Sequence, residues 1–538
     1  MTENVAAQFP EWHLRRRAVP IVAVLLMLAA WLALWTLPSE HLDRGMRTTS
    51  SFLAAVLAAV VVGVWYFGMA GVSRRTRAVT ALALLILLIG FLGSLRRVEF
   101  SGDMQPTFDF RWQTSREAKL DSYLASEQKG ENIVAVSTAV VQPSAEDSPC
   151  YRGANTAGIV VGPALARDWQ KHPPRCLWRH PCGGGYASYA VIGDSAVTLE
   201  QRGPEEVVVC YDISTGRHRW KYAYPAMFSE KLGGDGPRAT PAIHDRCVYS
   251  LGAAGDLVKL DFTTGELEWR VNILAENGSG NLEWGMSGSP LVVDGQVIVN
   301  PGAQQGTETS ADVLGFDDAD GRVVTRAGNA RSSYSSPMLA TLLGVPQLII
   351  FDAAGLAGFD PAGGQSLWRV PWTSDFDINA AQPVVLDDRH IVITSQAGCA
   401  LIEFALAEGH WIATQVWRNR QMKCSYANPV ARDGFLYGLD EGILACLCLK
   451  TGKRAWKERA GQYGHGQLLL AGDLLLVLSE KGELALVEAT PEAFRELGRI
   501  QAIDGKTWNN PVLVRGRALV RNHLEMACYE LPLADAPE

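Results

Sequence analysis

The feature that most constrains this chain is a short pattern that recurs from residue 207 onward. Most copies have an apolar stretch of alternating character, a turn containing glycine, and a tryptophan four residues after that glycine. Alternation with a period of two is typical of strands, and glycine tolerates the positive φ of a tight hairpin. Each copy therefore predicts a strand, a hairpin and a second strand. The clearest copies are VVVCYDISTGRHRW (207–220), LVKLDFTTGELEW (257–269), LAGFDPAGGQSLW (356–368) and ILACLCLKTGKRAW (443–456).

A proline begins another apolar strand upstream of each hairpin, so that one unit contains four strands. Pro241, Pro290, Pro337, Pro383 and Pro429 are spaced by 49, 47, 46 and 46 residues, and Pro511 follows after 82, enough for two shorter units. A related start lies near Tyr189. Eight units are therefore predicted, with seven as the alternative because the last two copies are degenerate. The expected starts are near residues 189, 241, 290, 337, 383, 429, 468 and 511.

The last unit stops after three strands, and this predicts how the units are arranged. Its missing outer strand is expected from the segment just before the first unit, around Arg175 to His180, and such an exchange closes a ring. A linear solenoid would instead need polar caps at both ends. We therefore predict an all-β fold, an eight-bladed β-propeller of four-stranded antiparallel blades, over residues 150–538.

Two residue types that recur with the units are interpreted as structural. A large ring on an outer strand fills the wedge between neighbouring blades, so the repeated tryptophans are expected to be buried. The repeated aspartates are expected to accept hydrogen bonds from backbone amides in the hairpins, and not to act as catalytic carboxylates. These residues are Trp220, Trp269, Trp368 and Trp456, and Asp212, Asp261, Asp317 and Asp360.

Three apolar runs precede the repeats, at residues 18–37, 52–72 and 78–95, and none contains a charged residue or a histidine. Each is long enough to cross a membrane as a helix, and a cleaved signal peptide would explain only the first. Arginines at 15–17 and at 74, 75 and 77 predict that residues 1–17 are cytoplasmic and that the chain after the third run lies on the far side. Because the runs lack ionisable groups, we interpret them as an anchor.

Residues 98–149 are expected to form a connector that holds the propeller away from the bilayer. A helix from Ser115 to Gln128 and a strand from Ile133 to Val141 are predicted within it. The ten cysteines contain no C-x-x-C pair, so a metal or haem site is unsupported. Cys176 and Cys182 are close enough in sequence for a disulfide, but free thiols are the preferred interpretation. A net charge of −8 leaves no basic excess, which argues against a nucleic acid partner.

The repeated D-x-x-T-G-x-x-x-W signature resembles the pyrroloquinoline quinone (PQQ) repeat. This repeat forms eight-bladed propellers in quinoprotein dehydrogenases and in non-catalytic relatives such as the assembly lipoprotein of the BamB type. Segments outside the signature, such as CYRGANTAGIV and DGKTWNNPVLVRGRALVRNHLEMACYEL, are similar to bacterial PQQ-like propellers. The resemblance covers roughly residues 150–533. It implies a protein of the bacterial inner membrane, multi-pass, with a periplasmic propeller and protein partners in the cell envelope.

The resemblance implies two functions from different classes. The preferred one is a binding or assembly scaffold without catalysis and without a cofactor, in which a small-molecule ligand remains possible. The alternative is a membrane-bound PQQ-dependent dehydrogenase for alcohols or sugars, which would use PQQ with Ca²⁺. Membrane glucose dehydrogenases of that family also carry helices ahead of the propeller and lack adjacent cysteines, as this chain does. However, no ordered set of Glu, Asn and Asp suggests a calcium cage here, and no catalytic residue is assigned. A purely structural envelope element, which would expose an apolar patch or sheet edge, is the third class.

Polar and aromatic residues that break the repeat at blade edges are the candidate binding residues. They fall just before or after the start of a blade, and loops on one face of a propeller are where such folds bind. Together at one mouth of the channel they would hold a small polar ligand, a peptide strand or a glycan. The alternative is that they satisfy a water-filled polar channel. They are Glu200, Gln201, Arg202, Glu283, Trp284, Tyr463, His465, Trp508, Asn509 and Asn510.

Overall fold

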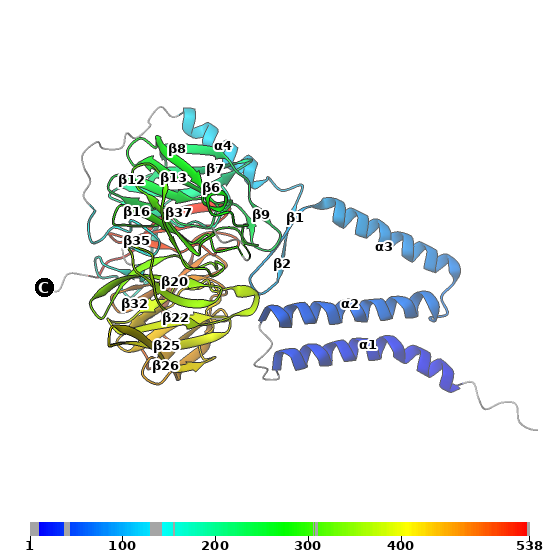
Figure 1. Ribbon diagram of the computed structural model, residues 1–538. Helices are drawn as coiled ribbons and strands as arrows, with labels where there is room; N and C mark the ends of the chain where they lie inside the picture. The colour runs from blue at the N-terminus through cyan, green and yellow to red at the C-terminus, as the bar shows by residue number, and fades with distance from the viewer. Residues whose placement is uncertain are drawn as a thin grey trace, which may run out of the picture. The chain divides into compact units, whose positions relative to one another are not determined.

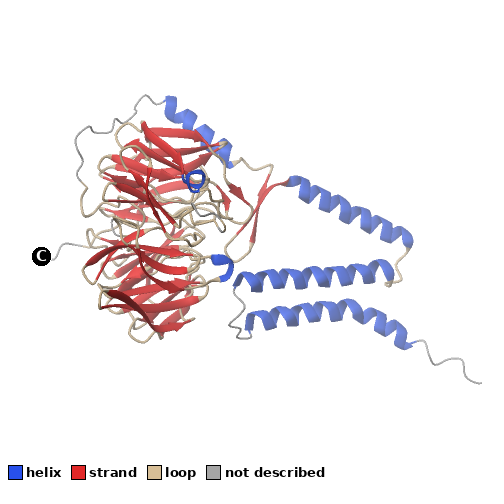
Figure 2. Ribbon diagram, viewed as in Figure 1, coloured by secondary structure: helices blue, strands red, loops and turns tan. Residues whose placement is uncertain are grey.

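The computed structural model describes residues 10–36, 44–129, 143–153, 156–304, 306 and 310–534. The chain forms two compact units, Met1–Ser115 and Arg116–Glu538. The boundary falls inside the predicted connector, so that its helix belongs to the second unit. The predicted strand from Ile133 to Val141 lies outside the described residues. Helices dominate the first unit and strands the second (Figure 2).

In its described residues, the first unit contains three helices that are long and apolar enough to cross a membrane, followed by a two-stranded hairpin. Helix α2 begins eight residues before the predicted start at Phe52. Its first turns are polar, and the hydroxyls of Thr48 and Ser51 donate to carbonyls one turn back, at 3.0 and 2.7 Å. The elements are α1 (Pro10–Thr36), α2 (Arg44–Gly68), α3 (Arg74–Ser94), β1 (Leu95–Phe100) and β2 (Pro106–Phe110).

The second unit is an eight-bladed β-propeller of four-stranded antiparallel sheets, as predicted (Figure 1). Every inner strand begins within one residue of its predicted start. Blades 1 to 4 consist of β5 (Ala190–Ile192), β6 (Ser195–Arg202), β7 (Glu205–Asp212) and β8 (His218–Pro225); β11 (Ala242–His244), β12 (Cys247–Leu251), β13 (Asp256–Asp261) and β14 (Leu267–Asn272); β15 (Leu291–Val293), β16 (Gln296–Val299), β17 (Val313–Asp317) and β18 (Val323–Ala327); and β19 (Met338–Leu342), β20 (Val345–Asp352), β21 (Gly355–Phe359) and β22 (Ser366–Pro371).

The remaining four blades continue the order of inner strand first and outer strand last, except at the closing blade. Blades 5 to 8 consist of β23 (Val384–Val385), β24 (His390–Ser395), β25 (Gly398–Ala407) and β26 (His410–Asn419); β27 (Val430–Arg432), β28 (Phe435–Asp440), β29 (Ile443–Cys448) and β30 (Arg454–Gln462); β31 (Gln467–Ala471), β32 (Leu474–Leu478), β33 (Glu483–Glu488) and β34 (Glu496–Gln501); and β35 (Val512–Val514), β36 (Arg517–Arg521), β37 (Glu525–Glu530) and β4 (Arg175–Pro181). Short elements outside the blades are α4 (Arg116–Lys129), β3 (Ile159–Val160), β9 (Ser229–Glu230), β10 (Gly234–Asp235), α5 (Ile273–Asn277) and the 3-10 helix η1 (Asp375–Asp377).

The ring closes as the sequence predicts. Strand β4, which precedes the first blade, pairs antiparallel with β37 and completes blade 8. Helix α4 covers this closure: the Tyr123 ring stacks on His180 at 4.7 Å, and its hydroxyl donates to the Gly216 carbonyl at 3.3 Å. Apolar side chains from facing blades form the core between them, for example Val191, Val209 and Leu519 between blades 1 and 8. Closure thus joins segments more than 300 residues apart in the sequence.

The outer-strand tryptophans link each blade to the next. The Trp220 indole donates to the carbonyl of Phe262 at 2.8 Å, and its ring lies against Gly265, where a Cβ would come within 2.5 Å of the ring. This contact explains why the facing hairpin turn of the next blade carries a glycine. The same bond to the following blade is made by Trp178, Trp269, Trp417 and Trp456.

One tryptophan departs from the predicted burial, and another departs from this hydrogen-bond pattern. Trp456 is only half-buried. Trp368 is buried but donates to Gln347 of its own blade, at 2.6 Å. The hairpin of blade 5 is longer than the others, and Trp368 packs on Phe404 in it with ring centroids 4.4 Å apart. Burial is therefore confirmed for three of the four predicted tryptophans.

The predicted roles of the hairpin aspartates and of the cysteines are confirmed. Asp212 accepts from the amides of Ser214 and Thr215, each at 3.0 Å, and the other three aspartates accept from equivalent amides. All ten cysteines are free thiols. Cys182 is buried, and its thiol donates to the carbonyl of Asn522 at 3.3 Å.

The centre of the ring is filled by the chain itself, which the repeat pattern did not predict. The described residues of 148–160, here called the central segment, contact inner strands around the ring. The Ile243 amide of blade 2 donates to Pro149, and β3 pairs in parallel with β31 of blade 7. The buried Arg152 guanidinium donates to Pro429 of blade 6 and Leu468 of blade 7, both at 3.2 Å. Only a position at the centre reaches so many blades.

Candidate functional site

Loops from the outer strand of one blade to the inner strand of the next lie on one face of the propeller, here called the connector face. This follows from the topology, because all eight inner strands run in the same direction. Two positions in these loops form rings of eight side chains, one from each blade. One position lies directly before the inner-strand proline or its equivalent, and the other lies two residues earlier.

The first of these rings is a belt of buried hydrogen bonds. In six successive junctions, the backbone amide of a belt residue donates to the belt side chain of the next blade, at 2.8 to 3.2 Å. All eight side chains are buried, so these bonds satisfy polar groups that would otherwise be costly. The belt is therefore structural. It consists of Ser188, Thr240, Ser289, Ser336, Gln382, Asn428, Gln467 and Asn510.

The second ring, which we call the mouth ring, is more exposed and rich in aromatic residues. Its members are Tyr186, Arg238, Ser287, Tyr334, Ala380, Tyr426, His465 and Trp508. Four of them form a continuous row of rings: His465 lies 4.7 Å from Tyr426, Tyr426 lies 5.6 Å from Trp508, and Trp508 lies 5.2 Å from Tyr186. These four side chains are half-buried, so each presents part of a ring to solvent.

Two cations and a carboxylate accompany this row. The Lys506 ammonium lies 4.3 Å from the Trp508 ring centroid and 5.6 Å from that of Tyr186. The Arg238 guanidinium lies 5.8 Å from the Tyr186 centroid on the neighbouring blade. The Trp508 indole donates to the buried carboxylate of Glu480 at 2.9 Å, which fixes the orientation of that ring. The row is thus held in place and carries positive charge at one end.

Several predicted site residues do lie on the connector face. Trp508 and His465 belong to the mouth ring, and Trp284 packs against Tyr334 of that ring at 5.7 Å. Glu283 is exposed beside Trp284. Asn509 and Asn510 lie beneath them and are buried: Asn509 donates to Ala187 at 2.8 Å, and Asn510 accepts from the guanidinium of Arg152 at 3.3 Å. The last two therefore support the loop.

Three predicted residues lie inside blade 1, and this corrects the prediction. Glu200 is fully buried and accepts hydrogen bonds from the Gly183 amide and the Tyr211 hydroxyl, at 2.8 and 2.7 Å. Arg202 pairs with Glu200 at 2.9 Å, and together with Arg521 it outweighs burial, so that the pKa of Glu200 falls to about 2. Gln201 donates to three backbone carbonyls. The polar residues after this strand are internal because β6 continues through them.

Tyr463 is a further correction. It is buried between blades 6 and 7, its hydroxyl donates to Glu496 at 2.5 Å, and the Arg499 guanidinium lies 4.8 Å from its ring centroid. Burial and the neighbouring carboxylate raise the pKa of Tyr463. The side chain therefore has no access to a ligand on the connector face.

Sequence reasoning missed Tyr186, Arg238, Tyr334, Tyr426 and Lys506. A signal was present for four of them, because they occupy the same register, two residues before the belt position, as the predicted Trp508 and His465. Aligning the units on their inner-strand starts would have found them. Lys506 lies outside this register and carries no signal of its own.

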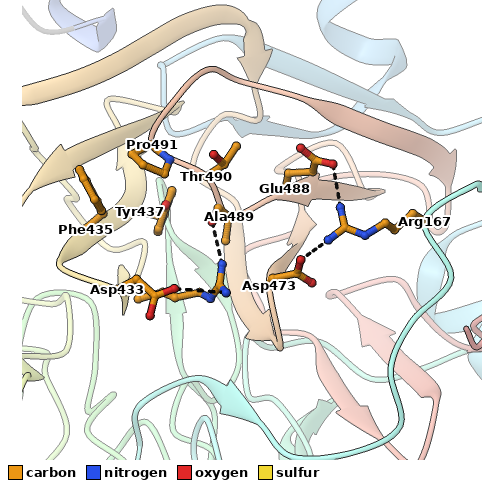
Figure 3. A pocket seen from close by; sticks show the side chains of 10 residues that line it. Arg167, Asp433, Phe435, Tyr437, Asp473, Glu488, Ala489, Thr490 and Pro491 are labelled. Carbon is orange, nitrogen blue, oxygen red and sulfur yellow. Dashed lines mark hydrogen bonds and ion pairs between the residues drawn. The ribbon is translucent and has the colours of Figure 1, made fainter. Parts of the chain in front are cut away.

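The opposite face, where the first and third turns of each blade lie, has two described pockets. One, of about 210 Å³ between blades 6 and 7, is lined by charged side chains that pair with one another (Figure 3). Arg167 contacts Asp473 and Glu488, and Arg432 donates to the Ala489 carbonyl at 3.1 Å. The other, of about 460 Å³, is lined mainly by apolar residues of blades 5 and 6 and by Ile159. Neither contains the half-exposed aromatic rings of the connector face.

Comparison with known proteins agrees with this architecture. An eight-bladed propeller with the D-x-x-T-G-x-x-x-W repeat defines the class of PQQ-like propellers. Within that class, the family described as "Outer membrane protein assembly factor BamB" matches residues 168–272 and 204–458, more than half of the 538-residue chain. The chain belongs to this family. A comparison with curated protein sequences found no match.

Solved structures share the fold at low sequence identity. Quinohemoprotein alcohol dehydrogenase from Comamonas testosteroni is 13% identical with a TM-score of 0.52, covering 79% of this chain and 86% of that one. The quinohemoprotein alcohol dehydrogenase ADHIIG from Pseudomonas putida HK5 is 13% identical with a TM-score of 0.52, covering 73% and 82%. BamB from Moraxella catarrhalis is 15% identical with a TM-score of 0.49, covering 68% and 99%. At these identities the likeness concerns the fold alone.

Proposed function

We propose that this protein is a membrane-anchored scaffold whose propeller binds another polypeptide through the mouth ring, without catalysis. The observation that carries the proposal is the row of half-exposed rings from His465 to Tyr186, flanked by Lys506 and Arg238. Tyrosine, tryptophan and arginine are the residues that dominate binding energy at protein interfaces, because they bury much area at a low cost in side-chain entropy. A rigid propeller with its loops pinned by the belt presents them with little reorganisation.

The location belongs to the same proposal. The three apolar helices α1, α2 and α3 support a membrane anchor. Arginines near the start of α1, ahead of its apolar run, and at the start of α3 support a cytoplasmic N-terminus, and an odd number of crossings then puts the propeller outside the cytoplasm. In a bacterium of the kind that holds this family, this is the periplasmic side of the inner membrane. The family description, an outer membrane protein assembly factor, favours partners in the cell envelope.

The PQQ and Ca²⁺ of quinoprotein dehydrogenases do not fit the residues present. Ca²⁺ takes six to eight oxygen ligands, usually including carboxylates. No group of three His, Cys, Asp or Glu side chains suited to a metal exists within the part of the chain that the structure describes. The centre of the ring instead holds the Arg152 guanidinium and the Tyr151 hydroxyl, which accepts from Asn428 at 2.9 Å and from Asn510 at 3.2 Å. A buried cation there repels a second one. We therefore derive no redox step.

Site-specific photo-crosslinking in the living bacterium tests the scaffold function. A photoreactive phenylalanine analogue replaces Trp508 on the connector face and, as the matched control, Thr264 in an exposed hairpin on the opposite face. We expect discrete polypeptide adducts from position 508 only, and we expect Tyr426→Ala to reduce them. Equal adducts from both positions, or none from position 508, would contradict the proposal.

A further inference from the structure

The strongest remaining feature of the connector face is the guanidinium of Arg238, which occupies the mouth-ring position of blade 2. It is held from two sides. Its terminal nitrogens donate to the carbonyls of Gly236 and of Gly234, the latter at 2.9 Å, and its plane lies 4.6 Å from the centroid of the Phe228 ring. The charge is therefore fixed in one place next to Tyr186, and does not sweep through solvent as a surface arginine would.

Arg238 has no carboxylate partner among the residues that the structure describes. The acidic side chains nearest in sequence are already engaged: Asp235 pairs with Arg116 and accepts from Ser229, and Glu230 accepts from the amides of Leu232 and Gly233. Burial lowers the pKa of Arg238, and the nearby carboxylates of Glu230 and Asp235 only partly offset this effect. A directly bound anion would stabilise such a partly desolvated guanidinium further.

Lys506 brings a second positive charge to the same ring. Its ammonium and the Arg238 guanidinium both lie within 6 Å of the Tyr186 centroid, at 5.6 and 5.8 Å. The row of rings thus ends in a cationic corner, made by Arg238, Lys506 and Tyr186. A planar guanidinium with free N–H groups is suited to a carboxylate, which it receives through two parallel hydrogen bonds.

We propose that the cationic corner recognises a carboxylate of the bound polypeptide, so that the partner segment carries an aspartate or glutamate next to an aromatic or apolar side chain. The acidic group binds Arg238, and the neighbouring side chain lies on Trp508 and Tyr426. This inference rests on the proposed function and adds the chemistry of the partner. Arg238 is a specificity residue in this account, and the aromatic row supplies most of the affinity.

The test is selection from a random-peptide display library on the full-length chain in lipid nanodiscs, with wild type and Arg238→Gln in parallel. Arg331→Gln is the matched control, because Arg331 is a connector-face cation that is already paired, with Asp377 at 2.8 Å. Arg238→Lys is included because it keeps the positive charge but loses the two parallel N–H donors of the guanidinium. The best peptide selected on wild type is then synthesised in two forms, one with its acidic residue and one with the corresponding amide. The binding of both forms is titrated at low and high salt.

We expect wild type and Arg331→Gln to select acidic peptides, and the acidic form to bind about tenfold more tightly than the amide at low salt, a typical effect of one charge-assisted contact. Arg238→Gln should erase this preference, and Arg238→Lys should keep part of it. If Arg238→Gln selects acidic peptides as wild type does, the inference is wrong. It is also wrong if wild type selects peptides that need Trp508 but show no acidic preference, although the binding function then stands. If wild type selects no peptide at all, both proposals fail.

Discussion

Two blade interfaces bury a carboxylate with no exposure, and they treat it in opposite ways. At the closure between blades 8 and 1, Glu200 lies near the arginines Arg202 and Arg521, and its pKa falls to about 2. Between blades 3 and 4, Asp312 lies beside a second buried carboxylate, Asp352, with Arg369 as their only arginine among the described residues. Burial and the like charge raise the pKa of Asp312 well above its ordinary value. Equally buried carboxylates therefore have pKa values shifted in opposite directions, and the neighbouring charges decide the direction.

These opposite pKa shifts indicate how the ring is held shut. The closure brings together the two ends of the repeat region, and its buried carboxylate lies near two arginines, of which Arg521 donates to Gly183, Thr198 and Leu199, at 3.0, 2.6 and 3.1 Å. The interface between blades 3 and 4 is formed by consecutive segments and tolerates two neighbouring carboxylates with one arginine. We therefore expect the removal of a buried charge to destabilise the closure and to stabilise the interface between blades 3 and 4.

The largest effect is expected from Arg521→Met. The change removes a fully buried guanidinium, leaves Glu200 with one fewer cation and removes hydrogen bonds to four acceptors, in Gly183, Ala187, Thr198 and Leu199. We predict a loss of about 3 to 5 kcal/mol in the free energy of unfolding, the range for breaking a buried ion pair. Urea unfolding of the full chain, monitored by tryptophan fluorescence, measures this loss of stability. Arg322→Met, at a side chain that is 71% exposed, is the control and should change stability little; equal losses would contradict the account.

Glu200→Gln tests the role of the buried charge at the closure through the pH dependence of stability. The folded-state pKa of Glu200 is depressed to about 2, so its stabilisation is present above the ordinary carboxyl pKa and is lost as pH falls toward 2. We predict that the variant is about 3 kcal/mol less stable than wild type at neutral pH, and that the two converge in acid. Unfolding free energies measured from pH 7 downward give this curve. A constant difference across the range would show that lost packing, and not charge, is responsible.

Asp312→Asn should act in the opposite direction. The pKa of Asp312 is raised, so the stability linked to its protonated form is present below the ordinary pKa and is lost as pH rises. Asparagine stays neutral and keeps the shape, so we expect the variant to be more stable than wild type by about 1 kcal/mol at neutral pH and equal to it in acid. The shift in melting temperature with pH measures this. A variant that is less stable at neutral pH would contradict the raised pKa of Asp312.

The smallest effect is expected from Glu530→Gln, which removes an exposed ion pair at the same closure. Arg175 and Glu530 lie 2.7 Å apart across β4 and β37, but their side chains are 69% and 48% exposed. Exposed pairs contribute little because water screens them, so we predict a change below about 0.5 kcal/mol. The same urea titration applies. A loss as large as that of Arg521→Met would mean that closure strength does not come from buried charge.

Most of the propeller follows from the sequence because its signals are local. The spacing of Pro241, Pro290 and Pro337 predicts the blade starts, and the incomplete last unit predicts that β4 closes the ring. The central segment lies outside the repeat, and the contacts of Arg152 join residues 277 to 358 positions apart, which no local pattern encodes.

The candidate site was predicted only in part. Trp508 and His465 stand out from the repeat and do reach the mouth ring, whereas Glu200 and Gln201 stand out equally and are buried. Polarity alone does not distinguish a ligand-facing group from a buried, paired one, because both break an apolar pattern. The position within the repeat does distinguish them, because a side chain two residues before the belt position faces the mouth, whatever its chemistry.

The proposed function requires that the propeller mouth binds a polypeptide and not a quinone. The most direct measurement is a titration of the full-length chain with PQQ and Ca²⁺, following the melting temperature together with dye reduction in the presence of simple alcohols and sugars. The account predicts no rise in melting temperature and no dye reduction. A clear stabilisation accompanied by substrate-dependent dye reduction would contradict it and would make the mouth ring the rim of an active site.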